Sequence, residues 1–150
     1  MEQAISDDHA IAELLRSARR IAVLGIKPES RIDRPAFFVP QYLQSVGYEV
    51  VPVPVYYPDA TTILGSPVYR TLSAIPGILD IVDVFRRPEH IAPHIPDIIA
   101  KRPRAVWFQS GIRHDQAARQ LMAAGISVVQ DRCMMTDHRR LVAVGAYDED

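Results

Sequence analysis

Residues 21–25 read Ile-Ala-Val-Leu-Gly, a short apolar run that ends at a glycine. Four further apolar runs follow along the chain, at 50–53, 81–85, 105–108 and 126–129. Short and nearly continuous apolar runs rich in Val and Ile are typical of strands that are buried on both faces of a sheet. The five runs therefore predict a parallel sheet of five strands.

Segments with the apolar spacing of amphipathic helices separate these runs. They are expected at about 7–17, before Gly47, around 95–99 and before Gly125. Glycine directly after a helical segment is a common stop signal. The alternation of strand and helix predicts right-handed crossovers and an α/β fold, in which a Rossmann-like, doubly wound parallel sheet has helices on both faces.

Two segments are less regular. Residues 56–77 are richer in Pro, Gly, Ser and Thr, and we expect an elaborated connection with a short strand near 68–69 and one helical turn near 72–75. Residues 141–144 fit either an extra strand or a covering segment, and the acidic end from 146 onward is expected to fray.

Length and composition favour one globular domain. The 150 residues are 48% hydrophobic and 23% charged, with 17 Lys and Arg against 18 Asp and Glu. A chain of this length buries roughly 68 to 70% of its unfolded surface, which is enough for a core without disulfides. We expect a single domain over 1–150, with an N-terminal helix within 1–18 and a tail over 142–150.

Several classes of partner and location are disfavoured. A net charge of −1 gives no general positive field for nucleic acid. The chain has no apolar run long enough to span a bilayer, and its acidic start at 1–8 lacks the features of a signal peptide. Cys133 is the single cysteine, which fits a reducing compartment. We expect a cytoplasmic protein with no nucleic-acid or membrane partner.

The loop after the first strand, 25–34, lies where open α/β sheets bind ligands. It has one glycine where a dinucleotide fingerprint needs three, and 53–57 offer no acid for a ribose. An NAD(P)-binding regulator is therefore disfavoured. Instead, the loop places several groups that can bind an anion before a helix that opens near Pro35: Lys27, Ser30, Arg31 and Arg34. The alternative is solvated surface charge.

Arg86 and Arg87 follow the third strand, where guanidinium groups can bind phosphate in bidentate fashion. The alternative is a salt bridge with Glu89 or Asp83. Residues 109–112 follow the fourth strand, where a glycine lets backbone approach a ligand closely.

The alternative at that fourth loop is an ordinary turn capped by Ser110. Tyr56 and Tyr57 are candidates for contact with an adenine because they lie just past the second strand. Trp107 and Phe108 are interpreted as core.

Cys133 follows the fifth strand beside Arg132, whose charge can lower a thiol pKa. No motif places His138 as its base, so a half-buried free thiol is favoured over a nucleophile, and a mixed disulfide with a ligand thiol is an intermediate possibility. His90 and His94 have metal-ligand spacing, but nearby prolines and the lack of a third ligand favour no metal.

Several motifs in order carry a family resemblance. They are Ile21–Gly25, Asp33-Arg34-Pro35, Tyr42-Leu43, Gly47-Tyr48 before Val51–Val53, Ile81–Arg87, Val106–Ile112 and Asp131-Arg132-Cys133. The chain resembles the small single-domain CoA-binding proteins, which are similar to the CoA-binding domain of the succinyl-CoA synthetase α subunit. It departs from many relatives at 55–58, where they have Asn-Pro, and often at Ser110.

The resemblance implies a Rossmann-like domain that binds coenzyme A or an acyl-CoA, as a binding module or sensor. The alternatives are an enzyme or enzyme subunit of acyl-CoA metabolism, with a protein partner or homo-oligomer possible. We expect no catalytic residue and no metal ligand. The expected CoA-binding residues are Gly25, Ile26, Lys27, Ser30, Arg34, Pro54, Val55, Tyr56, Phe85, Arg86, Arg87, Gln109, Ser110, Gly111, Ile112, Arg132 and Cys133.

Overall fold

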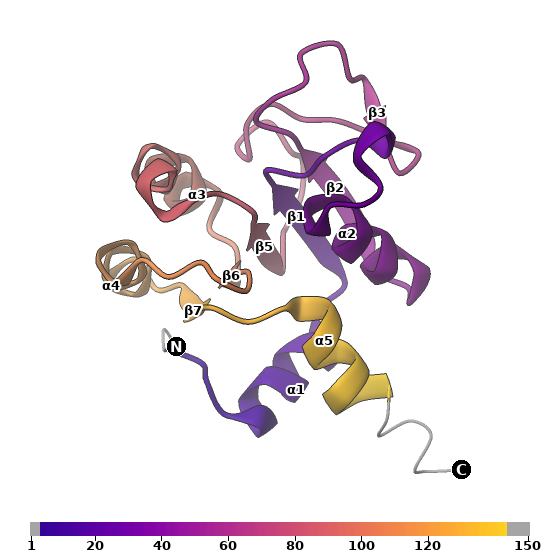
Figure 1. Cartoon of the computed structure of the whole chain (residues 1–150). Helices are drawn as coiled ribbons and strands as arrows, with labels where there is room; N and C mark the ends of the chain where they lie inside the picture. The colour runs from indigo at the N-terminus through magenta and orange to yellow at the C-terminus, as the bar shows by residue number, and fades with distance from the viewer. Residues whose placement is uncertain (1–3, 144–150) are drawn as a thin grey trace.

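The computed structural model describes residues 4–143, in which five parallel strands form one sheet in the order β2-β1-β5-β6-β7 (Figure 1). The predicted sheet is confirmed, with small differences at the strand ends. The strands are β1 (Arg20–Leu24), β2 (Glu49–Val53), β5 (Ile81–Val84), β6 (Ala105–Phe108) and β7 (Ser127–Val129). Because β2 and β5 pair with opposite sides of β1, the chain reverses its direction of travel across the sheet there.

Helices cover both faces of the sheet, as predicted. On one face, apolar residues of α1 (Asp8–Ser17), α2 (Pro35–Ser45) and α5 (Met134–His138) pack against alternate residues of the strands. On the other face lie α3 (Ile95–Lys101) and α4 (Asp115–Ala123), which Figure 1 shows side by side. This gives three layers, helix on sheet on helix.

Trp107 and Phe108 are consecutive on β6 and are both fully buried. Strand residues alternate between faces, so Trp107 belongs to the core under α1 and α2, and Phe108 to the core under α3 and α4. The indole Nε1 of Trp107 donates to the carbonyl of Arg132 at 2.7 Å, which satisfies its polar atom. The interpretation of both side chains as core is confirmed.

The connection between β2 and β5 differs in detail from the prediction. Its short strands are β3 (Thr62–Ile63) and β4 (Ser66–Pro67), an antiparallel hairpin rather than a strand near 68–69. Leu64 and Gly65 both have positive φ, so they form a tight turn, and pairing begins directly beside it. The expected helical turn is a single turn closed by the Ile75 N–H and the Leu72 carbonyl at 3.0 Å.

The end of the described chain is helical. Arg139–Ala143 continue α5 as a π-helical turn, so the alternative of an extra strand at 141–144 is wrong and the covering segment is correct for the described part. Leu141 and Val142 pack against the core under α1. The predicted acidic tail lies outside the described residues from 144 onward. Within 4–143, no helix combines the length and apolarity that crossing a bilayer requires.

Candidate functional site

The candidate site lies at the carboxyl ends of β1 and β5, where the strand order reverses. Open α/β sheets form a crevice at such a point, because the connections leave β1 and β5 toward opposite sides. The ladder continues past the strand ends: the Gly25 N–H donates to Val53 at 2.9 Å and the Phe85 N–H donates to Leu24 at 2.8 Å. The loops after β1 and β5 therefore start in contact with each other.

Gly25 makes this close approach possible. Its φ is +91°, a backbone conformation that side chains disfavour, and a Cβ added there would lie 2.3 Å from the carbonyl oxygen of Phe85. Both the conformation and the space therefore require glycine at this position. The glycine that ends the first strand brings the first loop directly against the end of β5.

Two adjoining hollows open at this edge. The main hollow has a volume of about 740 Å³ and is lined by Lys27, Arg34, Pro35, Ala36, Phe38, Val39, Phe85, Arg86, Arg87, Pro88, Gln109, Ser110, Gly111, Ile112, Cys133 and Met135. The tyrosine hollow has a volume of about 640 Å³ and is lined by Gly25, Ile26, Lys27, Arg31, Val55, Tyr56, Tyr57, Phe85, Arg86, Arg87 and His90. Both volumes fall in the usual range for ligand sites. The hollows share Lys27, Phe85, Arg86 and Arg87.

Five basic side chains line these hollows: Lys27, Arg31, Arg34, Arg86 and Arg87. None of the ion pairs formed within residues 4–143 includes any of them. The alternative of a salt bridge from Arg86 or Arg87 to Glu89 or Asp83 is therefore wrong for the described structure. Positive charge concentrated in a concave site without carboxylate partners is suited to an anionic ligand.

Arg86 is held by a histidine instead. Its Nε donates to Nε2 of half-buried His94 at 3.2 Å. Burial, followed by the charge of Arg86, lowers the pKa of His94, which keeps the ring neutral and able to accept this bond. This contact occupies one of the two ring nitrogens of His94. His90 and His94 stand in two successive 3-10 turns, Pro88–His90 and Ala92–His94.

The loop after β6 brings Gln109, Ser110, Gly111 and Ile112 into the main hollow. Gly111 has φ +83°, and its N–H donates to the Asp131 carboxylate at 2.6 Å. The alternative of an ordinary turn capped by Ser110 is right about the turn, which the Ile112 N–H and the Gln109 carbonyl close at 2.9 Å, and wrong about the cap. The N-cap of α4 is His114, whose Nδ1 accepts from the Ala117 N–H at 3.0 Å.

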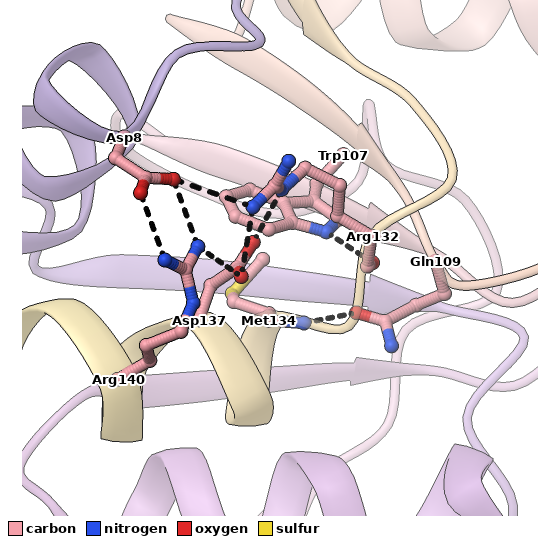
Figure 2. A network of polar contacts seen from close by, with 7 residues as sticks. All are labelled: Asp8, Trp107, Gln109, Arg132, Met134, Asp137 and Arg140. Atoms are coloured by element: carbon pink, nitrogen blue, oxygen red, sulfur yellow. Dashed lines mark hydrogen bonds and ion pairs between the residues drawn. The ribbon is translucent and has the colours of Figure 1, made fainter.

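The loop after β7 is fixed by a charged network (Figure 2). Arg132 contacts Asp137 at 2.7 Å and Asp8 at 3.6 Å, and Arg140 also pairs with Asp8, at 2.8 Å. Arg132 lines neither hollow, so its observed role is to join α1 to α5. Cys133, the next residue, does line the main hollow.

The sequence could not tell whether His138 serves Cys133. His138 is buried, and its Nδ1 lies 2.7 Å from the hydroxyl of Tyr42. Its ring also packs edge-on against Tyr48. Within the described chain, the Cys133 thiol has no hydrogen-bond partner, so the geometry includes no nucleophile paired with a base.

The remaining expected residues divide into two groups. Val55 and Tyr56 line the tyrosine hollow, where Tyr56 is 76% exposed and its ring lies 6.2 Å from that of Tyr57. Ile26 lines the same hollow from the core side. Pro54 is buried, Ser30 lies in an exposed 3-10 turn, and neither lines either hollow.

One wall of the main hollow is formed by residues that are not among the expected CoA-binding residues. That wall comes from the first turns of α2 and α5: Pro35, Ala36, Phe38, Val39 and Met135. The available signal was position, because the first turn of a helix after a strand lies at the binding edge of such a sheet. Arg31 and Tyr57, which the sequence indicates as anion-binding and adenine candidates, also line the tyrosine hollow, together with His90.

Comparison with known proteins places this chain in a family. Residues 19–139 match the CoA binding domain family. The Bacillus subtilis "Uncharacterized protein YneT" is 33% identical over 128 residues, covering 85% of this chain and 91% of that protein. A solved Thermus thermophilus structure, "cell-free ID.343", is 40% identical with a TM-score of 0.83, covering 91% of this chain and 99% of that one.

A more distant likeness concerns the fold alone. The structure of acetyl-coenzyme A synthetase 1 from Ca. Korarchaeum cryptofilum is 18% identical, with a TM-score of 0.65. The match covers 78% of this chain but only 27% of that one. It shows that the same three-layer domain also occurs inside a much longer chain.

Proposed function

This chain belongs to the CoA binding domain family, and from that premise we propose that it binds coenzyme A or an acyl-CoA in the two adjoining hollows. The observation that carries the proposal is the set of five basic side chains without carboxylate partners in the described structure: Lys27, Arg31, Arg34, Arg86 and Arg87. Coenzyme A has a pyrophosphate and a ribose 3′-phosphate, so its charge requires several cations. Arginine is suited to bidentate binding of phosphate.

The proposed orientation follows the chemistry of the two hollows. The phosphates bind at the shared wall, where Lys27, Arg86 and Arg87 lie. The adenine binds beside Tyr56 in the tyrosine hollow, because an exposed aromatic ring offers a stacking surface. The pantetheine arm extends through the main hollow toward Cys133, between apolar side chains of α2 and α5.

We propose a binding module or sensor of acyl-CoA rather than a catalyst acting alone. This proposal is supported by the geometry at Cys133: within residues 4–143 no base stands beside its thiol, because His138 contacts the Tyr42 hydroxyl instead. An enzyme subunit that uses the same hollows with chemistry from a partner is the second candidate, and the occurrence of this fold within a synthetase chain is consistent with it.

Isothermal titration calorimetry with coenzyme A and dephospho-CoA tests the proposal. We expect coenzyme A to bind more tightly, because the cations outnumber what a pyrophosphate needs. Arg86→Ala should weaken binding by about 1.5 to 3 kcal/mol if the side chain makes a desolvated charged hydrogen bond to phosphate. Arg119→Ala, an exposed position on α4 that lines neither hollow, is the matched control and should leave affinity unchanged.

Three results would contradict this proposal. Failure of both ligands to bind would reject the function itself. Equal affinity for coenzyme A and dephospho-CoA would remove the role assigned to at least one of Arg34, Arg86 and Arg87. A loss of less than about 1 kcal/mol on Arg86→Ala would indicate a surface contact only.

A further inference from the structure

Gln109 has a donor that the protein leaves unused. The residue is only 3% exposed and lines the main hollow directly after β6. Its Oε1 accepts the Met134 N–H at 3.2 Å. Among residues 4–143, no oxygen accepts a hydrogen bond from its Nε2. The side chain is nine-tenths buried, yet Nε2 is not among the fully enclosed atoms that lack a partner, so its two N–H donors open onto the main hollow and can be used by a ligand there.

The orientation of this amide is fixed by its surroundings. Met134 begins α5, and Asp137 of the same helix is held by Arg132 and Arg140. Figure 2 shows the Gln109 oxygen directed at the Met134 nitrogen and the amide nitrogen turned away from it. A rotation that exchanged oxygen and nitrogen would place a donor against the Met134 N–H. The free atom that faces a ligand is therefore the donor, Nε2.

The position of this donor after β6 indicates which part of a bound coenzyme A lies beside it. The cations stand on the loops after β1 and β5, whereas Gln109 follows β6 and Cys133 follows β7. Adjacent strands are about 4.8 Å apart, so a ligand whose phosphates lie at β1 and β5 must send its sulfur end across β6 toward β7. Apolar side chains also line the main hollow: Phe38, Val39, Ile112 and Met135. These walls suit an acyl group better than a bare thiol.

Resting on the proposed function, we propose that Nε2 of Gln109 donates a hydrogen bond to the thioester carbonyl of a bound acyl-CoA. The ligand class is then acyl-CoA thioesters in preference to free coenzyme A. Cys133 and the apolar walls surround the acyl group, and Gln109 distinguishes a carbonyl from a methylene at the atom next to sulfur.

A pair of ligands isolates this contact. Acetyl-CoA and S-ethyl-CoA differ in having a carbonyl or a methylene beside the sulfur, and they share the phosphates, the pantetheine amides and nearly the same size. Calorimetry on the full chain should give acetyl-CoA about a three- to tenfold tighter dissociation constant, which is the range of one net hydrogen bond. Free coenzyme A should bind more weakly than acetyl-CoA.

Two variants test the donor itself. Gln109→Glu keeps an oxygen for the Met134 N–H and replaces the donor, and Gln109→Met removes both polar atoms at similar length. We expect the preference for acetyl-CoA over S-ethyl-CoA to fall to about one in each variant that folds, with binding of S-ethyl-CoA changed by less than about twofold. Gln116→Glu, an exposed position on α4, is the matched control and should keep the wild-type preference.

The outcomes separate the two proposals. Equal affinity of the wild-type protein for acetyl-CoA and S-ethyl-CoA would overturn the role of Gln109 while leaving CoA binding in place. The role of Gln109 would also be overturned if both variants weakened the binding of acetyl-CoA and S-ethyl-CoA equally. The donor would then bind a pantetheine amide, which both ligands have. Failure of coenzyme A, acetyl-CoA and S-ethyl-CoA to bind would overturn the proposed function, and this inference with it.

Discussion

Asp83 is a carboxyl group at the centre of the sheet. It lies on β5 between Val23 of β1 and Trp107 of β6, and it is fully buried. Neither of its carboxyl oxygens has a hydrogen-bond partner among the described residues. Burial raises its pKa well above the usual value, so the folded protein holds Asp83 in its neutral form.

A pH dependence of stability follows from this burial. The unfolded chain ionises Asp83 near pH 4, whereas the folded chain does not, so the unfolded state binds fewer protons above that pH. The free energy of unfolding should therefore fall as pH rises from about 4 toward the folded pKa, by roughly 1.4 kcal/mol per pH unit from this group. Asp83→Asn should remove this slope.

Urea denaturation of the wild type and of Asp83→Asn from pH 4 to pH 8 gives the difference between their free energies of unfolding. The other titrating groups are the same in both proteins, so their contributions cancel in this difference. We expect the variant to gain stability relative to wild type with increasing pH. A difference that stays constant across this range would show that Asp83 ionises as readily in the folded protein as in the unfolded chain.

Cys133 gives a second prediction at the level of one residue, and it rests on the proposed function. If the sulfur of coenzyme A reaches the main hollow, the Cys133 thiolate can attack CoA disulfide, forming a protein-CoA disulfide and releasing one coenzyme A thiol. Intact mass spectrometry should show the addition of one CoA, lost on reduction. Cys133 is the single cysteine, so an adduct that persists in Cys133→Ser would contradict the assignment.

The position of a residue just after a predicted strand indicates that it lies near the candidate site. It does not indicate which side chains form ion pairs or hydrogen bonds with that residue. Arg132 stands at a strand end beside Cys133, as expected, yet Asp137 and Asp8 hold it outside both hollows. Asp8 lies on the first helix, and no local pattern links it to Arg132. Arg86 is a different case, because neither carboxylate of the alternative interpretation pairs with it and its Nε donates to His94, which no local pattern indicates.

Among the elements, the long periodic segments were predictable and the short pieces were not. The five strands and the main helices follow from apolar spacing, which acts within each segment. The hairpin of β3 and β4 depends instead on the tight turn at Leu64 and Gly65. The π-helical turn at Arg139–Ala143 lies against α1, to which Arg140 is tied by its pair with Asp8. The hairpin is therefore set by the conformation of two neighbouring residues, and the π-helical turn by a contact distant in the sequence; apolar periodicity reports neither.

The turn after β1 supports a prediction with a built-in control. Gly25 and Gly47 both have positive φ, but a Cβ at Gly47 meets nothing within 4 Å, whereas one at Gly25 meets the Phe85 carbonyl at 2.3 Å. Gly47→Ala should cost about 1 to 2 kcal/mol, the penalty of the left-handed conformation. Gly25→Ala should cost about 1 to 3 kcal/mol more, because backbone must move. Equal losses in urea denaturation would show that the loops after β1 and β5 are not in firm contact.

At the level of the whole molecule, the sequence predicts where the candidate site lies but only some of the residues that line it. A switch point follows from the strand order, which right-handed crossovers and short connections favour, and both hollows open there. The contribution of Phe38 and Val39 depends on how α2 packs on the sheet. The orientation of α2 on the sheet depends on the whole assembled core rather than on the sequence of any one segment.

The nature of the ligand can be tested on the whole molecule through its thermal stability. A ligand that binds only the folded state stabilises it by roughly 2.7 kcal/mol at 100 times its dissociation constant. For a domain of this size the melting temperature should rise by roughly 5 to 10 °C, at about 2 to 4 °C per kcal/mol.

We expect coenzyme A to produce this shift and NAD and NADP at the same concentration to produce none. The loop after β1 has Gly25 without the two further glycines of a dinucleotide turn, and β2 ends at Val53 followed by Pro54 and Val55, with no carboxylate for a ribose. Scanning calorimetry with the three ligands in parallel makes the comparison. A larger shift with NAD than with coenzyme A would reject the proposed ligand and keep the fold, because both ligand classes bind at the same edge of such a sheet.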